Sequence, residues 1–139
     1  MVIMAFDYGD VRTGVAVCDR LEMLASPLAV VKESYQPRLL DKLMPLIEEN
    51  KPELLVVGLP KNMDGSLGFR AQACREFAEK LTERSGIAHA MVDERLSSVM
   101  AHAALHQAGK KEKKHGAVVD AAAAAEILDR YLTWRKNRS

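Results

Sequence analysis

Three acidic residues, far apart in the chain, have the side-chain type and the positions expected of divalent-cation ligands. Asp7 follows an apolar run, Glu94 follows a second apolar segment, and Asp120 directly precedes five alanines. Carboxylate oxygens are hard ligands of the kind that Mg²⁺ and Mn²⁺ prefer. A site of this kind activates water and neutralises the charge that develops on a phosphodiester. The three acids therefore predict hydrolytic chemistry on phosphates, provided that the fold brings them together.

Each acid also has a purely structural interpretation. Asp7 could bond backbone amides of the turn that follows it, Glu94 could pair with Arg95 at a solvated strand end, and Asp120 could sit at a helix N-terminus. Two features favour the site. The apolar run before Asp7 places it deep at the centre of a sheet, where an ionised carboxylate needs a cation or several donors. The five alanines let the last helix approach its neighbours closely.

The elements that must position these acids are strands and helices in alternation. The run at 53–60 is apolar on both faces, as in a strand covered by helices on both sides. Pro45 lacks an amide donor and should kink or restart the first helix, and Gly86 is the expected cap of the second. We expect strands at 2–6, 13–18, 28–33, 53–60 and 87–92, and helices at 38–50, 67–86, 97–109 and 119–135.

This element order is typical of an α/β fold whose mixed sheet has an antiparallel edge meander, parallel crossovers and helices on both faces. In such sheets the site lies outside the carboxyl ends of the parallel strands. Asp7, the 58–64 loop and the pair Asp93 and Glu94 all fall at such ends. Strand alternation puts Glu94 on one face of the sheet and Asp93 on the other, so only one of the two acids faces the site.

Composition narrows the class of protein. The 139 residues fit one domain. No apolar run approaches the ~20 residues of a membrane helix and the first residues lack a signal peptide's features, so we expect a cytoplasmic protein with no membrane partner. Cys18 and Cys74 have no zinc or disulfide spacing. The net charge of +1 provides no global field for nucleic acid, so a local patch must hold any such partner.

The stretch "GKKEKKHG" supplies a candidate patch through Lys113 and Lys114 and their neighbours. This pattern is typical either of a solvated loop or of an arm that contacts phosphates beside the site. Arg12, Arg70 and Arg95 could extend it. Aromatic residues make up only 5% of the chain, so stacking platforms are not expected to carry the affinity. Recognition of backbone and shape is favoured instead.

Four segments together, "FDYGDVRTGVAVCD", "VVGLPKNMDGSLGFRAQACREFAEKL", "DERLSS" and "VVDAAAAAEILDRYL", resemble the YqgF family. This RNase H-like group is described as Holliday-junction resolvases and as nucleases that mature the end of the small-subunit ribosomal RNA. The resemblance covers nearly all of the chain, in order. It implies one RNase H-like three-layer domain over 1–139, with a five-stranded mixed sheet of order 3-2-1-4-5, and a divalent-metal nuclease using Mg²⁺ or Mn²⁺.

The resemblance also assigns residues. Asp7, Glu94 and Asp120 match the family's catalytic and metal-binding acids, the last of them opening the final helix. Gly14 belongs to the hairpin motif. Amides at a helix start near Ser66 would suit a phosphate. The candidate substrate contacts are Gly9, Arg12, Gly58, Pro60, Asp64, Gly65, Ser66, Arg95, Lys113 and Lys114.

The function expected is therefore a metal-dependent endonuclease acting on structured RNA, such as the 5′ end of a ribosomal RNA precursor, or on branched DNA. Two alternatives stay open. "DYGDVRTG" also resembles the phosphate-binding hairpin of sugar-kinase and actin-like ATPases, although those proteins close two lobes around the nucleotide. The chain could also be a catalytically silent module that binds nucleic acid or protein. Junction cutting in two strands would suit a two-fold homodimer.

Overall fold

The structure, a computed structural model, describes residues 1–59, 69–93 and 115–137, with side chains described from 122 onward in the last of these segments. The predicted helix at 97–109 lies outside these ranges, as do Glu94 and the side chain of Asp120. Within the described segments, no helix is long and apolar enough to cross a membrane.

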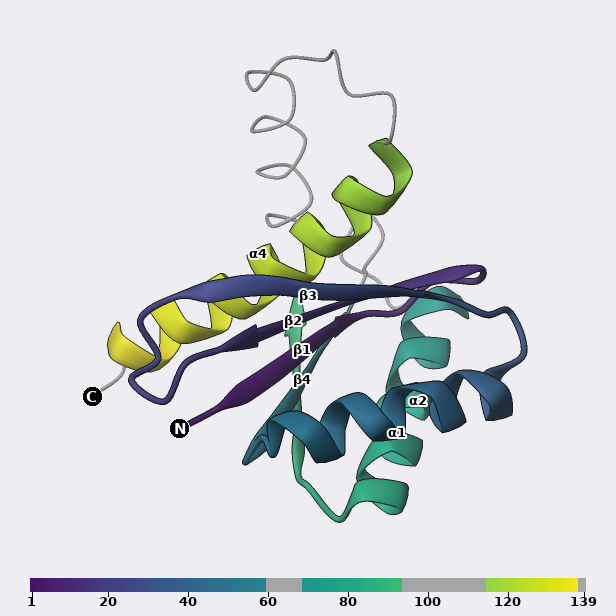
Figure 1. Cartoon of the computed structure of the whole chain (residues 1–139), viewed down its shortest axis with the longest axis horizontal. Helices are drawn as coiled ribbons and strands as arrows, with labels where there is room; N and C mark the ends of the chain where they lie inside the picture. The colour runs from purple at the N-terminus through teal and green to yellow at the C-terminus, as the bar shows by residue number, and fades with distance from the viewer. Residues whose placement is uncertain (60–68, 94–114, 138–139) are drawn as a thin grey trace.

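Five strands form one mixed sheet of order β3-β2-β1-β4-β5 (Figure 1). β1 pairs antiparallel with β2, and β2 with β3, whereas β4 runs parallel to both β1 and β5. This is the sheet order and the edge meander expected from the sequence. The strands are β1 (Ile3–Asp7), β2 (Arg12–Cys18), β3 (Ala25–Lys32), β4 (Leu54–Leu59) and β5 (His89–Asp93).

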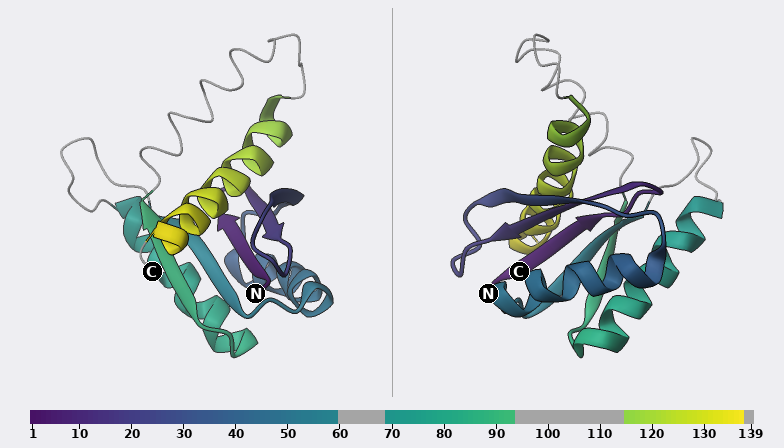
Figure 2. Two further views of the ribbon diagram at one scale, coloured as in Figure 1. Left: turned by 90° about the vertical axis from the view of Figure 1, so that its left-hand side faces the viewer. Right: turned by 45° about the vertical axis from the view of Figure 1, so that its right-hand side comes forward.

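Helices cover both faces of the sheet and make three layers (Figure 2). α1 (Gln36–Asn50) and α2 (Phe69–Ser85) share one buried apolar cluster with the sheet, and α4 (His115–Asn137) shares a second cluster on the other face. α4 lies mainly across β1, β2 and β3. The central strands β1 and β4 are therefore buried on both faces, which explains their nearly continuous apolar sequences.

The alternation along β1 decides which face Asp7 occupies. Met4 and Phe6 belong to the cluster under α1 and α2, and Ile3 and Ala5 belong to the cluster under α4. Because side chains of a strand alternate between faces, Asp7 follows Ile3 and Ala5 onto the α4 face.

Helix boundaries follow local chemistry in one case and tertiary packing in another. Gly86 has φ +75°, and its amide donates to the carbonyl of Thr82, as a glycine cap after α2 should. α1, by contrast, continues through Pro45 without the predicted restart. Leu39, Leu43 and Ile47, on both sides of Pro45, are buried in the same cluster, so packing of the two halves outweighs the missing amide.

The final helix begins earlier than the sequence suggested. α4 starts at His115, so Asp120 lies more than one turn inside it and does not open the helix. The macrodipole interpretation of Asp120 is therefore wrong, because that effect is confined to the first turn. The alanine run does pack closely, since Ala124 is fully buried against the sheet.

The opposite end of α4 is tied to the β2–β3 turn. Arg135 donates from Nε to Glu22 Oε1 at 2.8 Å and from Nη2 to Oε2 at 3.3 Å. Glu22 Oε2 also accepts from the amino group of Met1 at 2.8 Å. These contacts, with Arg135 first, lower the pKa of Glu22 to about 2. They lie at the sheet edge opposite the carboxyl ends of the parallel strands.

Candidate active site

The carboxyl ends of the three parallel strands meet at one edge of the sheet. β1 ends at Asp7, β4 at Leu59 and β5 at Asp93. Leu59 and Asp93 are paired neighbours, and the β1–β4 register keeps the ends of those two strands level. The prediction is confirmed for the ends of these three strands, while residues 60–64 and Glu94 lie outside the described residues.

Glycines flank Asp7 on both neighbouring strands. Gly14 is its partner on β2. The parallel β1–β4 register, continued by one residue, brings Gly58 level with Asp7, and Gly58 is paired with Val92 of β5. Neighbouring residues on adjacent strands share a face. Neither adjacent strand therefore places a side chain beside the Asp7 carboxylate on the α4 face.

The chemistry of this position fits a small divalent cation. Asp7 is only partly buried, although the four residues before it in β1 are fully buried. Mg²⁺ is typically held by one or two carboxylates and keeps several of its waters, so a partly exposed carboxylate suits it. Among the described side chains, no three His, Cys, Asp or Glu residues are grouped to hold a metal. The predicted triad needs Glu94 and Asp120, which lie outside that set.

Within β5, Met91 and Val92 show the alternation from which the faces of Asp93 and Glu94 were predicted. Val92 packs against the cluster under α4, and Met91 packs against the cluster under α1 and α2. The α4 face is thus shared by Val92 and Asp7. The position of Glu94 itself lies outside the described residues.

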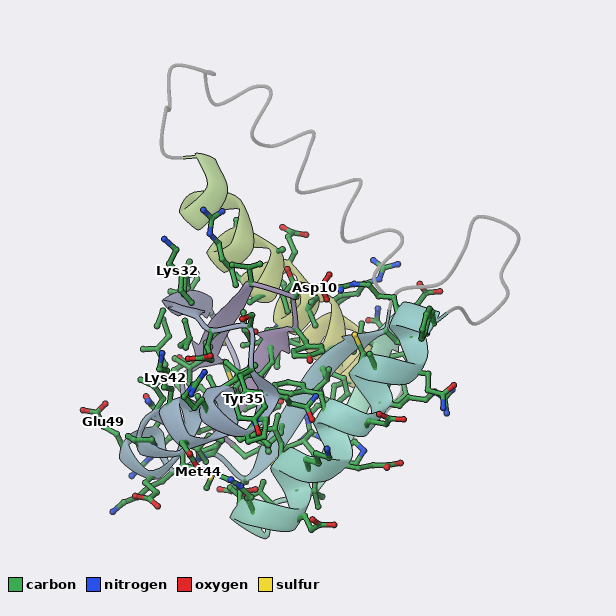
Figure 3. All side chains as sticks on the ribbon, turned by 90° about the vertical axis from the view of Figure 1, so that its right-hand side faces the viewer. Asp10, Lys32, Tyr35, Lys42, Met44 and Glu49 are labelled. Carbon is green, nitrogen blue, oxygen red and sulfur yellow. The ribbon has the colours of Figure 1, made fainter. Side chains whose placement is uncertain are left out.

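The turn after Asp7 is held by α2, an arrangement that the sequence did not reveal. Arg70 donates from Nη2 to the carbonyl of Tyr8 at 2.6 Å and from Nη1 to Asp10 Oδ1 at 2.9 Å. Figure 3 labels Asp10 at this turn, beside the N-terminal end of α2. Arg70 was expected only to extend a phosphate-binding patch. Its guanidinium instead bonds the backbone next to a candidate catalytic acid.

The same turn packs against side chains of α1 and α2, and its backbone makes a close approach at Gly9. The Tyr8 ring stacks on Phe77 with centroids 4.3 Å apart, and its hydroxyl accepts from Gln36 Nε2 at 3.1 Å. A Cβ at Gly9 would collide with the carbonyl oxygen of Arg12. Gly9 is therefore required for the close approach within this turn, a role apart from the substrate contact expected of it.

The remaining predicted site residues divide into two groups. Arg12 is exposed at the start of β2, at the same edge as Asp7, and Gly58 is buried in β4. The others lie outside the described residues: Pro60, Asp64, Gly65, Ser66, Arg95, Lys113 and Lys114.

Comparisons with known proteins point to one family. A family model described as "RuvX: Holliday junction resolvase" matches residues 1–134. A relative from Natranaerobius thermophilus, named "Putative pre-16S rRNA nuclease", is 40% identical over 139 residues, covering 100% of this chain and 99% of its own. One from Halothermothrix orenii, with the same name, is 41% identical over 135 residues and covers 97% and 96%.

Solved structures share the fold at low identity. The Thermus thermophilus RuvC structure in complex with a Holliday junction substrate aligns over 100% of this chain and 98% of that chain, with a TM-score of 0.65 and 18% identity. The fowlpox virus resolvase with Holliday junction DNA aligns over 97% and 99%, with a TM-score of 0.60 and 12% identity. The RNase H-like fold predicted from the sequence is confirmed.

Proposed function

Because this chain belongs to the RuvX family of Holliday junction resolvases, the group that its motifs resemble under the name YqgF, we propose that it uses Asp7, Glu94 and Asp120 to cleave phosphodiester bonds in structured nucleic acid. The observation that carries the proposal is the setting of Asp7. It ends the central strand at the carboxyl edge, partly exposed, with glycine neighbours on both sides. That setting favours a carboxylate that binds a cation over one that is buried for structural reasons.

The other two acids are expected on the same face. Glu94 follows β5 directly, and the alternation of Val92 favours the α4 face for it. Asp120 belongs to α4, which packs over that face. β1 and β5 are separated by one strand, so their backbones lie roughly 10 Å apart. Two carboxylates reaching over the bare Gly58 can share a hydrated cation across such a gap.

The three acids would hold Mg²⁺ or Mn²⁺, which when bound lowers the pKa of water and offsets charge on the phosphate. The chain's own residues do the positioning. Arg70 fixes the carbonyl of Tyr8 and thereby the turn that carries Asp7. Arg12, exposed at the same edge, is placed to contact a phosphate of the substrate strand. Lys113 and Lys114 are proposed to add to that patch.

The names of the relatives favour a ribosomal RNA precursor as substrate. We further propose that the cut serves 5′-end maturation and that residues 1–139 form a single nuclease domain. Branched DNA is the second substrate, which the family description favours. The two are separated by giving the purified protein a precursor RNA fragment, a four-way DNA junction and a linear duplex, each with Mg²⁺ or Mn²⁺.

Asp7→Asn tests the assignment itself. We expect the variant to lose at least about 1,000-fold in cleavage rate, because removing a ligand charge costs several kcal/mol of transition-state stabilisation. The control is Asp41→Asn, the same change at an exposed residue of α1, which should cleave as the wild type does. Unchanged cleavage by Asp7→Asn would remove the proposal. Binding without cleavage by the wild type under every metal would favour the silent module.

A further inference from the structure

A hollow of about 320 Å³ lies between β5 and the C-terminal part of α4, and the mechanism above does not use it. Figure 2, left, shows the yellow end of α4 beside the green β5. The hollow is lined by Met91, Val92 and Asp93 of β5 and by Arg130, Tyr131 and Trp134 of α4. Its β5 wall ends at Asp93, at the carboxyl end of that strand, whereas its α4 wall ends at Trp134, next to Arg135, which Glu22 holds at the opposite edge of the sheet. We refer to it below as the β5–α4 pocket.

Two aromatic rings form the α4 side of this pocket. The centroids of Tyr131 and Trp134 are 5.5 Å apart and their planes are tilted by 39°. Tyr131 is partly buried against the apolar cluster under α4, and Arg135, one turn further along the helix, is held by Glu22. Trp134 is 52% exposed. One wall is thus fixed by the fold while the other presents its ring to a ligand.

Charge distinguishes this pocket from its neighbour. A second hollow, of about 380 Å³, shares Arg130 and Trp134 but is otherwise lined by Glu126, Asp129 and Thr133. Burial and then the nearby Asp129 raise the pKa of Glu126. Two carboxyl groups make that hollow unfavourable for a phosphate. On the β5 side, Arg130 faces a single acid, Asp93, so a nucleic-acid strand is better accommodated there.

We propose that the β5–α4 pocket stacks an unpaired nucleobase of the substrate strand on Tyr131 and Trp134, with Arg130 contacting an adjoining phosphate. The inference rests on the proposed function for its ligand class and deepens it: the preferred substrate has an unpaired nucleotide several positions away from the cleaved bond. A base has a π-face whatever its identity, so the pocket accepts any sequence. Trp134 comes 14 residues after Asp120 in α4, about 21 Å along the helix axis, so the stacked base lies several nucleotides from the cleaved bond.

This pocket revises an expectation from composition. The low aromatic content argued against stacking platforms, but content does not report position. Tyr131 and Trp134 are three residues apart, so one helix brings both rings to the same side. Packing of α4 against the sheet then places that side beside β5.

Trp134 is the only tryptophan in the chain, so the intrinsic tryptophan fluorescence reports on the surroundings of this one residue. Asp7→Asn protein, which should bind without cutting, is titrated with a single-stranded oligonucleotide and with a blunt duplex of the same length. The proposal expects quenching by the single strand and little by the duplex. Equal quenching by both, or binding of the single strand with no change in fluorescence, would overturn it.

A second test measures the affinity for a labelled single-stranded oligonucleotide by fluorescence anisotropy. Trp134→Ala should weaken binding about tenfold, and Trp134→Phe should restore most of it. Arg130→Gln should reduce the slope of log affinity against log salt by about one. The matched control is Tyr35→Ala, since Tyr35 is 55% exposed but begins α1 on the other face. Affinity unchanged in Trp134→Ala, or weakened equally in Tyr35→Ala, counts against the pocket.

The two proposals fail separately. If the single strand quenches the fluorescence and Trp134→Ala weakens binding, but the wild-type protein does not cleave, the pocket proposal is supported and the nuclease proposal is contradicted. If cleavage depends on Asp7, but there is no quenching and Trp134→Ala binds normally, the nuclease proposal is supported and the pocket proposal is contradicted.

Discussion

The two edges of the sheet are held by different kinds of contact. At the carboxyl edge, the Arg70–Asp10 ion pair has side chains that are 44% and 87% exposed. At the opposite edge, the side chains of the Arg135–Glu22 pair are 34% and 20% exposed, and the pKa of Glu22 is lowered to about 2. An exposed pair contributes little to stability, whereas a sheltered one contributes more. Of these two ion pairs, the one remote from the candidate site therefore contributes more to stability, whereas the Arg70 contacts serve to position the turn after Asp7.

The difference predicts that changes at the carboxyl edge affect catalysis first and that changes at the opposite edge affect stability first. Elements around an active site are often drawn from the less stable parts of a protein. Matched substitutions at the two edges therefore test the comparison directly.

Among the matched substitutions at the two edges, Gly9→Ala is expected to have the largest effect on activity. Its new methyl group would collide with the Arg12 carbonyl and displace the turn after Asp7. A displacement of about 1 Å in a catalytic group can cost on the order of 100-fold in rate. The measurement is kcat on the best substrate of the panel.

Gly86→Ala is the counterpart at the other edge. Gly86 has a positive φ but open space around it, so alanine should cost about 1 kcal/mol of unfolding free energy and leave kcat unchanged. Equal losses of activity in Gly9→Ala and Gly86→Ala would contradict the division between the edges.

Arg70→Ala should lower kcat by about 10- to 100-fold with little change in Tm, because its ion pair is exposed but its bond to the Tyr8 carbonyl orients the turn. Arg84→Ala is the matched control, since Arg84 is also on α2 and pairs with Asp41 at similar exposures of 39% and 64%. If both variants lose activity alike, Arg70 has no special role at the site.

The effect expected of Glu22→Gln is on stability. The lowered pKa of Glu22 means that its carboxylate stabilises the fold above its ordinary pKa of 4.5, and that this contribution is lost as the pH falls toward about 2. At pH 7 we expect a loss of about 1 to 2 kcal/mol, after allowance for partial exposure. Thermal unfolding of both proteins from pH 7 to pH 3 should show the difference shrinking.

Glu49→Gln controls for the removal of a surface charge, since Glu49 is exposed near the end of α1 (Figure 3). It should leave Tm within the error of the measurement. A Glu22→Gln deficit that stays constant or grows as the pH falls would rule out the ion pair as its cause.

The sequence was enough to predict the parts of the molecule that local patterns encode. The apolar runs of β1 and β4 predicted these two strands, and the family resemblance implied the order of the sheet. The restart at Pro45 was wrong because packing on both sides of it holds α1 together. The start of α4 was misplaced because Gly116, a poor helix former, lies in its first turn.

Contacts between distant residues could not be predicted in this way. Arg70 and Asp10 are 60 positions apart, and Arg135 and Glu22 are 113 apart. No periodicity links such pairs, and charged residues are common on any surface. Their partners are set by where the layers place the ends of α2 and α4. The β5–α4 pocket has the same origin, since its walls come from elements that are separated in the chain.

The central claim is that Asp7, Glu94 and Asp120 converge on one cation. The most direct test is the anomalous diffraction signal of Mn²⁺ in crystals of the protein. The claim predicts a peak roughly 2.0–2.2 Å from a carboxylate oxygen of Asp7, with oxygens of Glu94 and Asp120 bound to the same ion or to a second ion beside it. A peak elsewhere, or Asp7 without Mn²⁺ while the three carboxylates point apart, would contradict it.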